Sequence, residues 1–92
     1  MPKNVGRVGL DYAGPPTAIL MDPRVPNVFV NGKPIAVVGT TVTPHGKPPH
    51  NAAIMGTGSP NVFAGANFPV CGRGDMASCT DLLVSTSNVF VN

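Results

Sequence analysis

The stretch NVFVN at residues 27–31 decides the fold, because it recurs as NVFAG at residues 61–65 and as NVFVN at residues 88–92. Three copies of one short motif in a chain of 92 residues indicate an internal repeat. Each copy is rich in the β-branched and aromatic residues that are typical of strands. The sequence therefore predicts three equivalent strands.

A second, weaker motif completes the repeat. PIAVVG at residues 34–39 follows the first copy, PVCGRG at residues 69–74 follows the second, and the matching NVGRVG stands at residues 4–9, near the other end of the chain. The chain thus reads as three units, each a strand ending in Gly, a long loop and an NVF strand. The three loops comprise residues 10–26, 40–60 and 75–87.

This order predicts an all-β fold: one domain over residues 1–92, built as a small cone of three pseudo-threefold β-hairpin units. Residues 31–33 and 65–67 carry the Gly and Asn that tight hairpin turns require. The first and last strands are expected to pair with each other, which would seal the ring and leave few free strand edges. The short turns would then lie at one pole and the three long loops at the other, the apex.

Strand alternation predicts which side chains face the axis of the cone. We expect the valines to point inward, and therefore Phe29, Phe63 and Phe90 to point outward, one on each facet. The residues aligned next to the axis are small, so that three phenyl rings would overfill it. The alternative is the reverse facing, with the rings in the core. The inward residues are Val28, Val30, Val62, Val89 and Val91, and the small axial ones are Gly6, Ala36 and Cys71.

Composition excludes several classes of protein. The chain has 11 Gly and 11 Pro, but its 42% hydrophobic content and 11% charged content indicate a packed domain and not a disordered segment. Six Lys and Arg are scattered singly, which gives no basic stripe for nucleic acid. No apolar run has the length of a signal peptide or of a transmembrane segment. A domain this small usually needs a staple such as a metal, a disulfide or a partner.

The soft metal ligands gather in two of the three loops. His45 and His50 lie in loop 40–60 with four residues between them, and Cys79 lies in loop 75–87. Four intervening residues are within the range for paired His ligands of zinc, and the threefold order would bring both loops to the apex. Cys71 aligns with Ala36, so it is either a small axial residue or a fourth ligand. Solvated histidines and a disulfide between the two cysteines are the alternatives.

Catalysis has little support in the sequence. The chain has four Asp and no Glu, so neither a carboxylate pair nor a Glu general base beside a metal can be assembled from a familiar motif. The tripeptide RGD at residues 73–75 is accounted for as the end of a repeat strand. We expect a protein that is not an enzyme and that has no small-molecule substrate. The alternatives are a small metal-dependent hydrolase and a disulfide-stabilised secreted binding module.

The order of these motifs resembles that of the PAAR-repeat proteins. The resemblance rests on NGKPIA at residues 31–36, GSPNVF at 58–63, FPVC at 68–71 and RGD at 73–75, and it extends over essentially the whole chain. It implies a membrane-piercing cone whose base caps a trimeric β-helical spike, one tip per trimer, in a phage tail or a type VI secretion system. It also implies a virion baseplate or a secreted location after synthesis in the bacterial cytoplasm, and a bare tip with no fused toxin.

The resemblance further implies one metal ion near the point, zinc first and iron second, which the family typically holds through three His and one Cys. His45, His50 and Cys79 match three of those ligands. Loop 10–26 has DYAG at residues 11–14 where the family usually places a His. The fourth ligand is therefore open among Cys71, an oxygen donor such as Asp11, and water.

Overall fold

The computed structural model describes residues 2–48, 50–65 and 67–91. Their eight strands, each two residues long, form four antiparallel pairs. These are β1 (Lys3–Asn4) with β8 (Phe90–Val91), β2 (Tyr12–Ala13) with β7 (Leu83–Val84), β3 (Phe29–Val30) with β4 (Lys33–Pro34), and β5 (Phe63–Ala64) with β6 (Phe68–Pro69). Within these ranges there is no helix, and so none that could cross a bilayer. The all-β prediction is confirmed.

Two hairpins and a third antiparallel strand pair form the base of the cone. In β3–β4, Asn31 and Gly32 both have positive φ (51° and 79°), as a type I′ turn requires. Gly65 and Asn67 also have positive φ in the β5–β6 turn, while Ala66, at the middle of that predicted turn, lies outside the described residues. The third strand pair, β1 with β8, joins the two ends of the chain. The predicted sealing of the ring by the first and last strands is therefore confirmed.

Above the base, three chain segments form a triangle around the axis. Gly6 N–H donates to Cys71 C=O, Cys71 N–H to Ala36 C=O, and Ala36 N–H to Gly6 C=O, at 2.9 to 3.0 Å. This closed cycle of hydrogen bonds makes the pseudo-threefold symmetry explicit. Small residues are required here, because a Cβ on Gly6 would lie 2.7 Å from a Leu83 methyl group and 3.0 Å from the Ala36 Cβ.

The segments predicted as long loops are more regular than expected, because each folds back on itself as an arm. Six strand segments from the three arms pair in a closed circle, which we call the upper ring. Its pairs are Tyr12–Ile19, Leu20–Val42, Thr41–Ile54, Met55–Ala77, Met76–Leu82 and β2–β7. Most of these contacts are single bridges, too short to give a strand pattern in the sequence.

Two apolar clusters fill the cone. One lies inside the upper ring and includes Leu20, Met55 and Leu83, which occupy the same place in the three units because each accepts a hydrogen bond from the Gly that ends the preceding strand. The other lies toward the base and includes Val5, Val30, Ile35, Val37, Ala64 and Val70.

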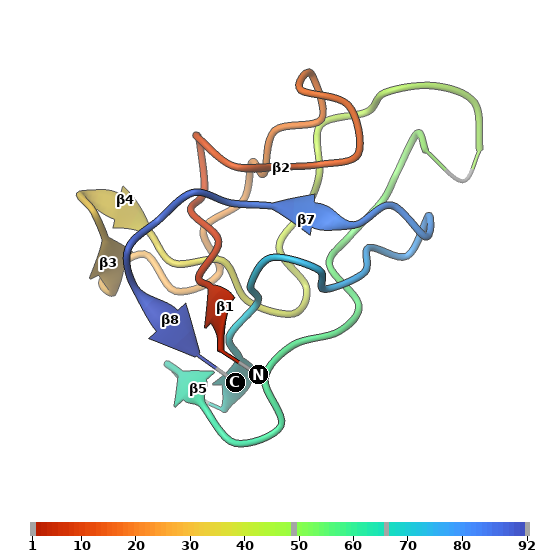
Figure 1. The fold of residues 1–92 in the computed structure, drawn as a ribbon. Helices are drawn as coiled ribbons and strands as arrows, with labels where there is room; N and C mark the ends of the chain where they lie inside the picture. The colour runs from red at the N-terminus through yellow and green to blue at the C-terminus, as the bar shows by residue number, and fades with distance from the viewer. Residues whose placement is uncertain (1, 49, 66, 92) are drawn as a thin grey trace.

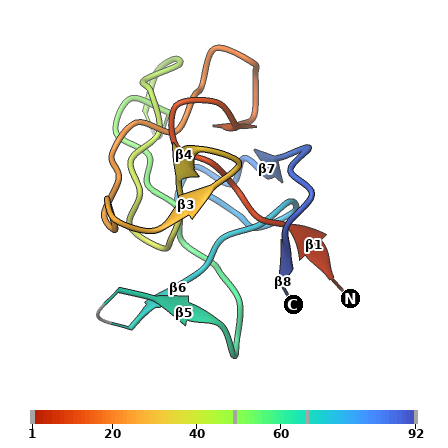
Figure 2. The same cartoon turned by 90° about the vertical axis from the view of Figure 1, so that its left-hand side faces the viewer.

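The overall shape follows the symmetry. The principal extents are 32 × 25 × 24 Å, one long axis and two nearly equal short ones. Figure 1 shows the three strand pairs of the base and both ends of the chain on the lower and left sides, and the arms at the top and right. The view turned by 90° in Figure 2 again places β5–β6 and β1–β8 at the lower end, away from the arms.

The three phenylalanines point outward, as predicted: Phe29, Phe63 and Phe90 are 60%, 52% and 56% exposed. The expectation for the valines was only partly right. Val30 is buried and Val62 and Val91 pack against the lower cluster, but Val28 and Val89 are exposed. Each strand is only two residues long, so the alternation does not extend to the residue before it.

Candidate metal centre

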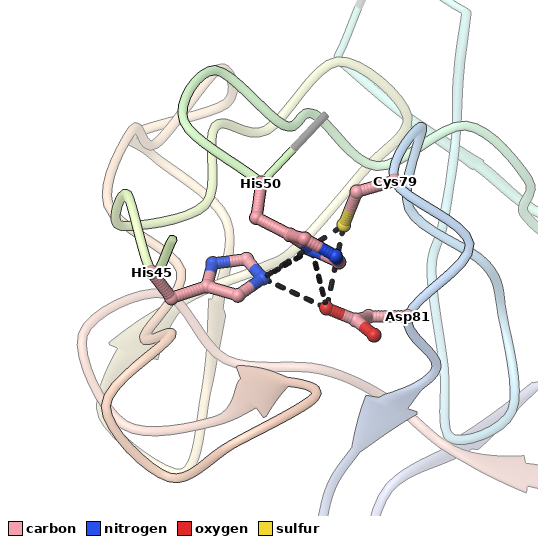
Figure 3. A group of neighbouring side chains, drawn as sticks. All are labelled: His45, His50, Cys79 and Asp81. Atoms are coloured by element: carbon pink, nitrogen blue, oxygen red, sulfur yellow. Dashed lines mark hydrogen bonds and ion pairs between the residues drawn. The ribbon is translucent and has the colours of Figure 1, made fainter. Parts of the chain in front are cut away.

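Four potential metal ligands meet at the apical end of the arms (Figure 3). His45 and His50 come from the second arm, and Cys79 and Asp81 come from the third. Their donor atoms all lie within 4.8 Å of one another. The structure thus brings together the three residues that the sequence analysis placed at the apex and adds a fourth, Asp81.

Local turns aim these side chains at one point. In the second arm, His45 N–H donates to His50 C=O (3.0 Å) and His50 N–H donates to Lys47 C=O (2.7 Å), which folds the two imidazoles together. In the third arm, Ala77 N–H donates to Asp81 C=O (2.8 Å) and Thr80 adopts a positive φ of 71°. That tight turn places the Cys79 thiol and the Asp81 carboxylate side by side.

The distances between donor atoms fit a single tetrahedral ion. His45 Nε2 lies 2.7 Å from Asp81 Oδ2 and 3.1 Å from His50 Nδ1. Cys79 Sγ lies 3.4 Å from Asp81 Oδ2 and 3.9 Å from His45 Nε2. A tetrahedral zinc site with usual bond lengths has edges of about 3.3 to 3.6 Å between N, O and S ligands. The observed distances lie on both sides of that range, so the side chains would have to shift by some tenths of an ångström to accept zinc.

Hydrogen bonding prepares His45 to be a ligand. Its Nδ1 lies 2.8 Å from the carbonyl oxygen of Thr43, to which it can donate only as Nδ1–H, and this leaves Nε2 facing the other donors. The Thr43 carbonyl and the Asp81 carboxylate raise the pKa of His45, and the His45 imidazole lowers the pKa of Asp81. A proton and a metal ion therefore compete for the same nitrogen.

The site is closed on one side and open on the other. The His45 side chain is only 3% exposed and Cys79 is buried, whereas the side chains of Asp81 and His50 are 25% and 35% exposed. An ion would reach the site past His50. Four donors would fill a tetrahedral coordination sphere, which is the pattern of structural zinc, because catalytic zinc keeps one position for water.

The two protein candidates for the fourth ligand lie elsewhere. The Cys71 thiol donates to Thr57 C=O at 3.1 Å, and burial raises its pKa to about 12. Asp11 forms a buried ion pair with Arg7 at 2.8 Å. Both cysteines are free, so the disulfide alternative finds no support. The donor atom nearest to the predicted three belongs instead to Asp81.

A signal for Asp81 was present in the repeat. Asp81 C=O accepts from Ala77 N–H as Ala18 C=O accepts from Ala13 N–H and Ala53 C=O from Val42 N–H, so the three residues are equivalent. A charged residue at a position where the other two units have Ala indicates a local function. The alignment of the arms, and not only of the strands, was needed to find it.

The same equivalence supplies matched variants for a test. Asp81→Ala gives the third unit the residue of the other two, and Cys71→Ala copies the axial Ala36. We expect Asp81→Ala to weaken zinc binding by at least about 10-fold through loss of one ligand, and Cys71→Ala to retain one ion per chain. Competition with a chromophoric chelator measures both affinities. Unchanged affinity in Asp81→Ala, or loss of the ion in Cys71→Ala, would assign the fourth position differently.

Comparison with known proteins agrees with this geometry. The family model described as PAAR motif matches residues 11–85, which include the whole upper ring and all four candidate ligands. Among curated proteins, no sequence matches the chain. Since the match spans well over half of the 92 residues, the chain belongs to the PAAR motif family.

Proposed function

We propose that this protein is the tip of a contractile injection machine, where it caps a trimeric β-helical spike and pierces the target membrane. The observation that carries the proposal is the closed pseudo-threefold architecture: one chain forms two equivalent hairpins, and its two ends form the third strand pair, which seals the circle. A single copy can therefore match all three chains of a threefold partner. Membership in the PAAR motif family supports the same role.

The base of the cone has the features of the contact surface. The strand pairs β1–β8, β3–β4 and β5–β6 each expose one phenylalanine, so Phe29, Phe63 and Phe90 form a threefold set that we call the lower ring. Exposed aromatic residues at the centre of an interface are typical binding hot spots. We propose that each of the three phenyl groups contacts one chain of the spike, and that the turns at residues 31–33 and 65–67 contribute to the same contact.

The proposed role of the metal is structural. His45, His50, Cys79 and Asp81 would hold one ion, zinc in preference to iron, because two imidazoles and a thiolate are soft enough to favour zinc. When bound, the ion cross-links the second and third arms at the apex. With all four donors engaged no position is left for a reacting water, which supports a rigid point and not a hydrolase. The protein would act in a phage tail baseplate or after export by a type VI or related apparatus.

Substitution of the lower ring tests the proposal. Phe29→Ser alone should cost at most about 1 kcal/mol of stability and leave the metal content intact, because the side chain is mainly exposed. Phe29→Ser, Phe63→Ser and Phe90→Ser together should weaken binding to the cognate spike trimer by roughly 100-fold or more. Native mass spectrometry of the wild-type complex should give one tip per trimer.

The matched control is Leu82→Ser, which removes an exposed apolar side chain from the opposite half of the cone. It should leave binding to the spike unchanged. A complex of three tips per trimer, or full affinity in the triple phenylalanine variant, would contradict the proposed mode of capping.

A further inference from the structure

The outward face of the upper ring is apolar where an exposed strand face is usually polar. Ile19, Ile54 and Leu82 occupy the same position in the three arms and are 36%, 42% and 49% exposed. The residues on both sides of each are turned to the interior or to the metal site, so the alternation of the strand is kept. Its outward positions, however, are not the polar ones that water-facing strands carry.

Further apolar side chains extend this face around the cone. Leu10 and Met21 in the first arm and Met76 in the third are also exposed. We call these residues the upper belt: Leu10, Ile19, Met21, Ile54, Met76 and Leu82. It contains members from every arm, so it surrounds the axis. A single protein partner covers one side of a domain, whereas a surrounding medium contacts all sides.

Few charges interrupt the upper belt. Among the described residues of the arms, Asp11 and Asp75 are paired with Arg7 and Lys3, and Asp81 belongs to the metal site. Three charged residues without such a role remain there: Asp22, Lys47 and Arg24, which lies over the ring of Phe68. Transfer of this surface into an apolar environment would therefore require few ions to lose their water.

The backbone of the upper ring is also suited to an apolar environment. Lipid has no groups that can hydrogen-bond to free N–H and C=O groups, so strands that enter it must be paired on both sides. In the upper ring each segment has such neighbours: residues 19–20, for example, pair with Tyr12 on one side and with Val42 on the other. The closure of the circle by β2 and β7 completes the pairing.

We propose that the upper belt is a lipid-contacting surface, which embeds in the acyl chains of a bilayer around the tip. The net charge of +2 favours a bilayer with anionic headgroups. This inference rests on the proposed function, in which the contractile machine supplies the force that brings the tip to the membrane. The contact itself depends only on the upper belt and can be measured without the spike.

The chain carries its own probe for this contact. Tyr12 is the one Tyr in a sequence without Trp, and it pairs with Ile19 in the upper ring. The experiment uses zinc-loaded full-length protein and vesicles of phosphatidylethanolamine and phosphatidylglycerol, with bromine on the acyl chains. We expect the vesicles to bind the protein and the brominated acyl chains to quench the Tyr12 fluorescence.

Two triple variants separate the belt from exposed apolar residues in general. Ile19→Ser, Ile54→Ser and Leu82→Ser together should weaken vesicle binding by roughly 30-fold or more, from the apolar area lost. The control replaces Phe29, Phe63 and Phe90 with Ser at the opposite end and should bind vesicles like the wild type. Zinc content and circular dichroism verify that the variants fold. If the triple variant does not fold, Leu82→Asn alone replaces it, and we expect this single substitution to weaken vesicle binding about 3-fold.

Three outcomes would overturn the inference: no binding of the wild-type protein to the vesicles, equal binding of the upper-belt variant, or loss of binding in the phenylalanine variant alone. Capture of one tip per spike trimer is measured separately. If that capture is retained while vesicle binding is absent, the proposed capping function stands and the lipid-contacting surface does not.

Discussion

His50→Ala is expected to lower the melting temperature of the zinc-loaded protein by about 20 °C or more. Structural zinc contributes roughly 10 kcal/mol or more to the folding of small domains, and in a chain of this size about 1 kcal/mol corresponds to several degrees. His50 is the informative ligand to remove, because its side chain is partly exposed and contributes less packing than the buried His45. Thermal unfolding followed by circular dichroism, with and without a chelator, measures the effect.

Lys47→Ala is the matched control for that substitution. Lys47 is exposed in the same turn, between the two histidines, and its side chain is not among the ligands. It should leave both the zinc content and the melting temperature unchanged. Should the chelated wild-type protein melt at the same temperature as the zinc-loaded form, the ion would not be part of the fold and the structural role proposed for it would be wrong.

The repeat is the reason why so much of the fold could be predicted from sequence. A single short strand predicts a hairpin only weakly, but the NVF strand and the Gly-terminated strand each occur three times, so an error in one unit is corrected by the others. The sealing of the ring by β1 and β8, the turn at Asn31–Gly32 and the outward facing of the phenylalanines all follow from that redundancy.

The arms lacked this redundancy and were harder to predict. Their lengths differ between units, and their pairing consists mainly of single bridges between segments far apart in the sequence. The sequence therefore predicts three loops in place of the upper ring, and the equivalence of Asp81 with Ala18 and Ala53 appears only when the arms are aligned by their hydrogen bonds. Asp11 was a candidate ligand because it stands in the loop segment where the family usually places a His, and nothing in its sequence neighbours revealed that its carboxylate pairs with Arg7.

Asp11→Ala is expected to destabilise the protein by about 3 to 5 kcal/mol, because it leaves a buried guanidinium without its partner. The Asp11 carboxylate accepts hydrogen bonds from the Arg7 backbone N–H (2.8 Å), from Arg7 Nε (2.8 Å) and from the Ser85 hydroxyl (2.9 Å), and both charged residues are buried. The bridge between Arg7 and Ile35 holds the Arg7 backbone beside the axis, and the Arg7 guanidinium also donates to the Thr86 hydroxyl at 3.0 Å. Urea unfolding of the zinc-loaded protein measures the loss.

Asp22→Ala removes the same charge from an exposed position of the same arm and should change stability by no more than about 0.5 kcal/mol. The metal content separates the two roles that the Asp11 carboxylate could have. As the partner of Arg7, its removal should lower stability while each folded chain still binds one zinc ion through the second and third arms. Loss of zinc from folded Asp11→Ala protein would instead make Asp11 a ligand. A stability equal to that of Asp22→Ala would show that the buried pair of Arg7 and Asp11 does not stabilise the fold.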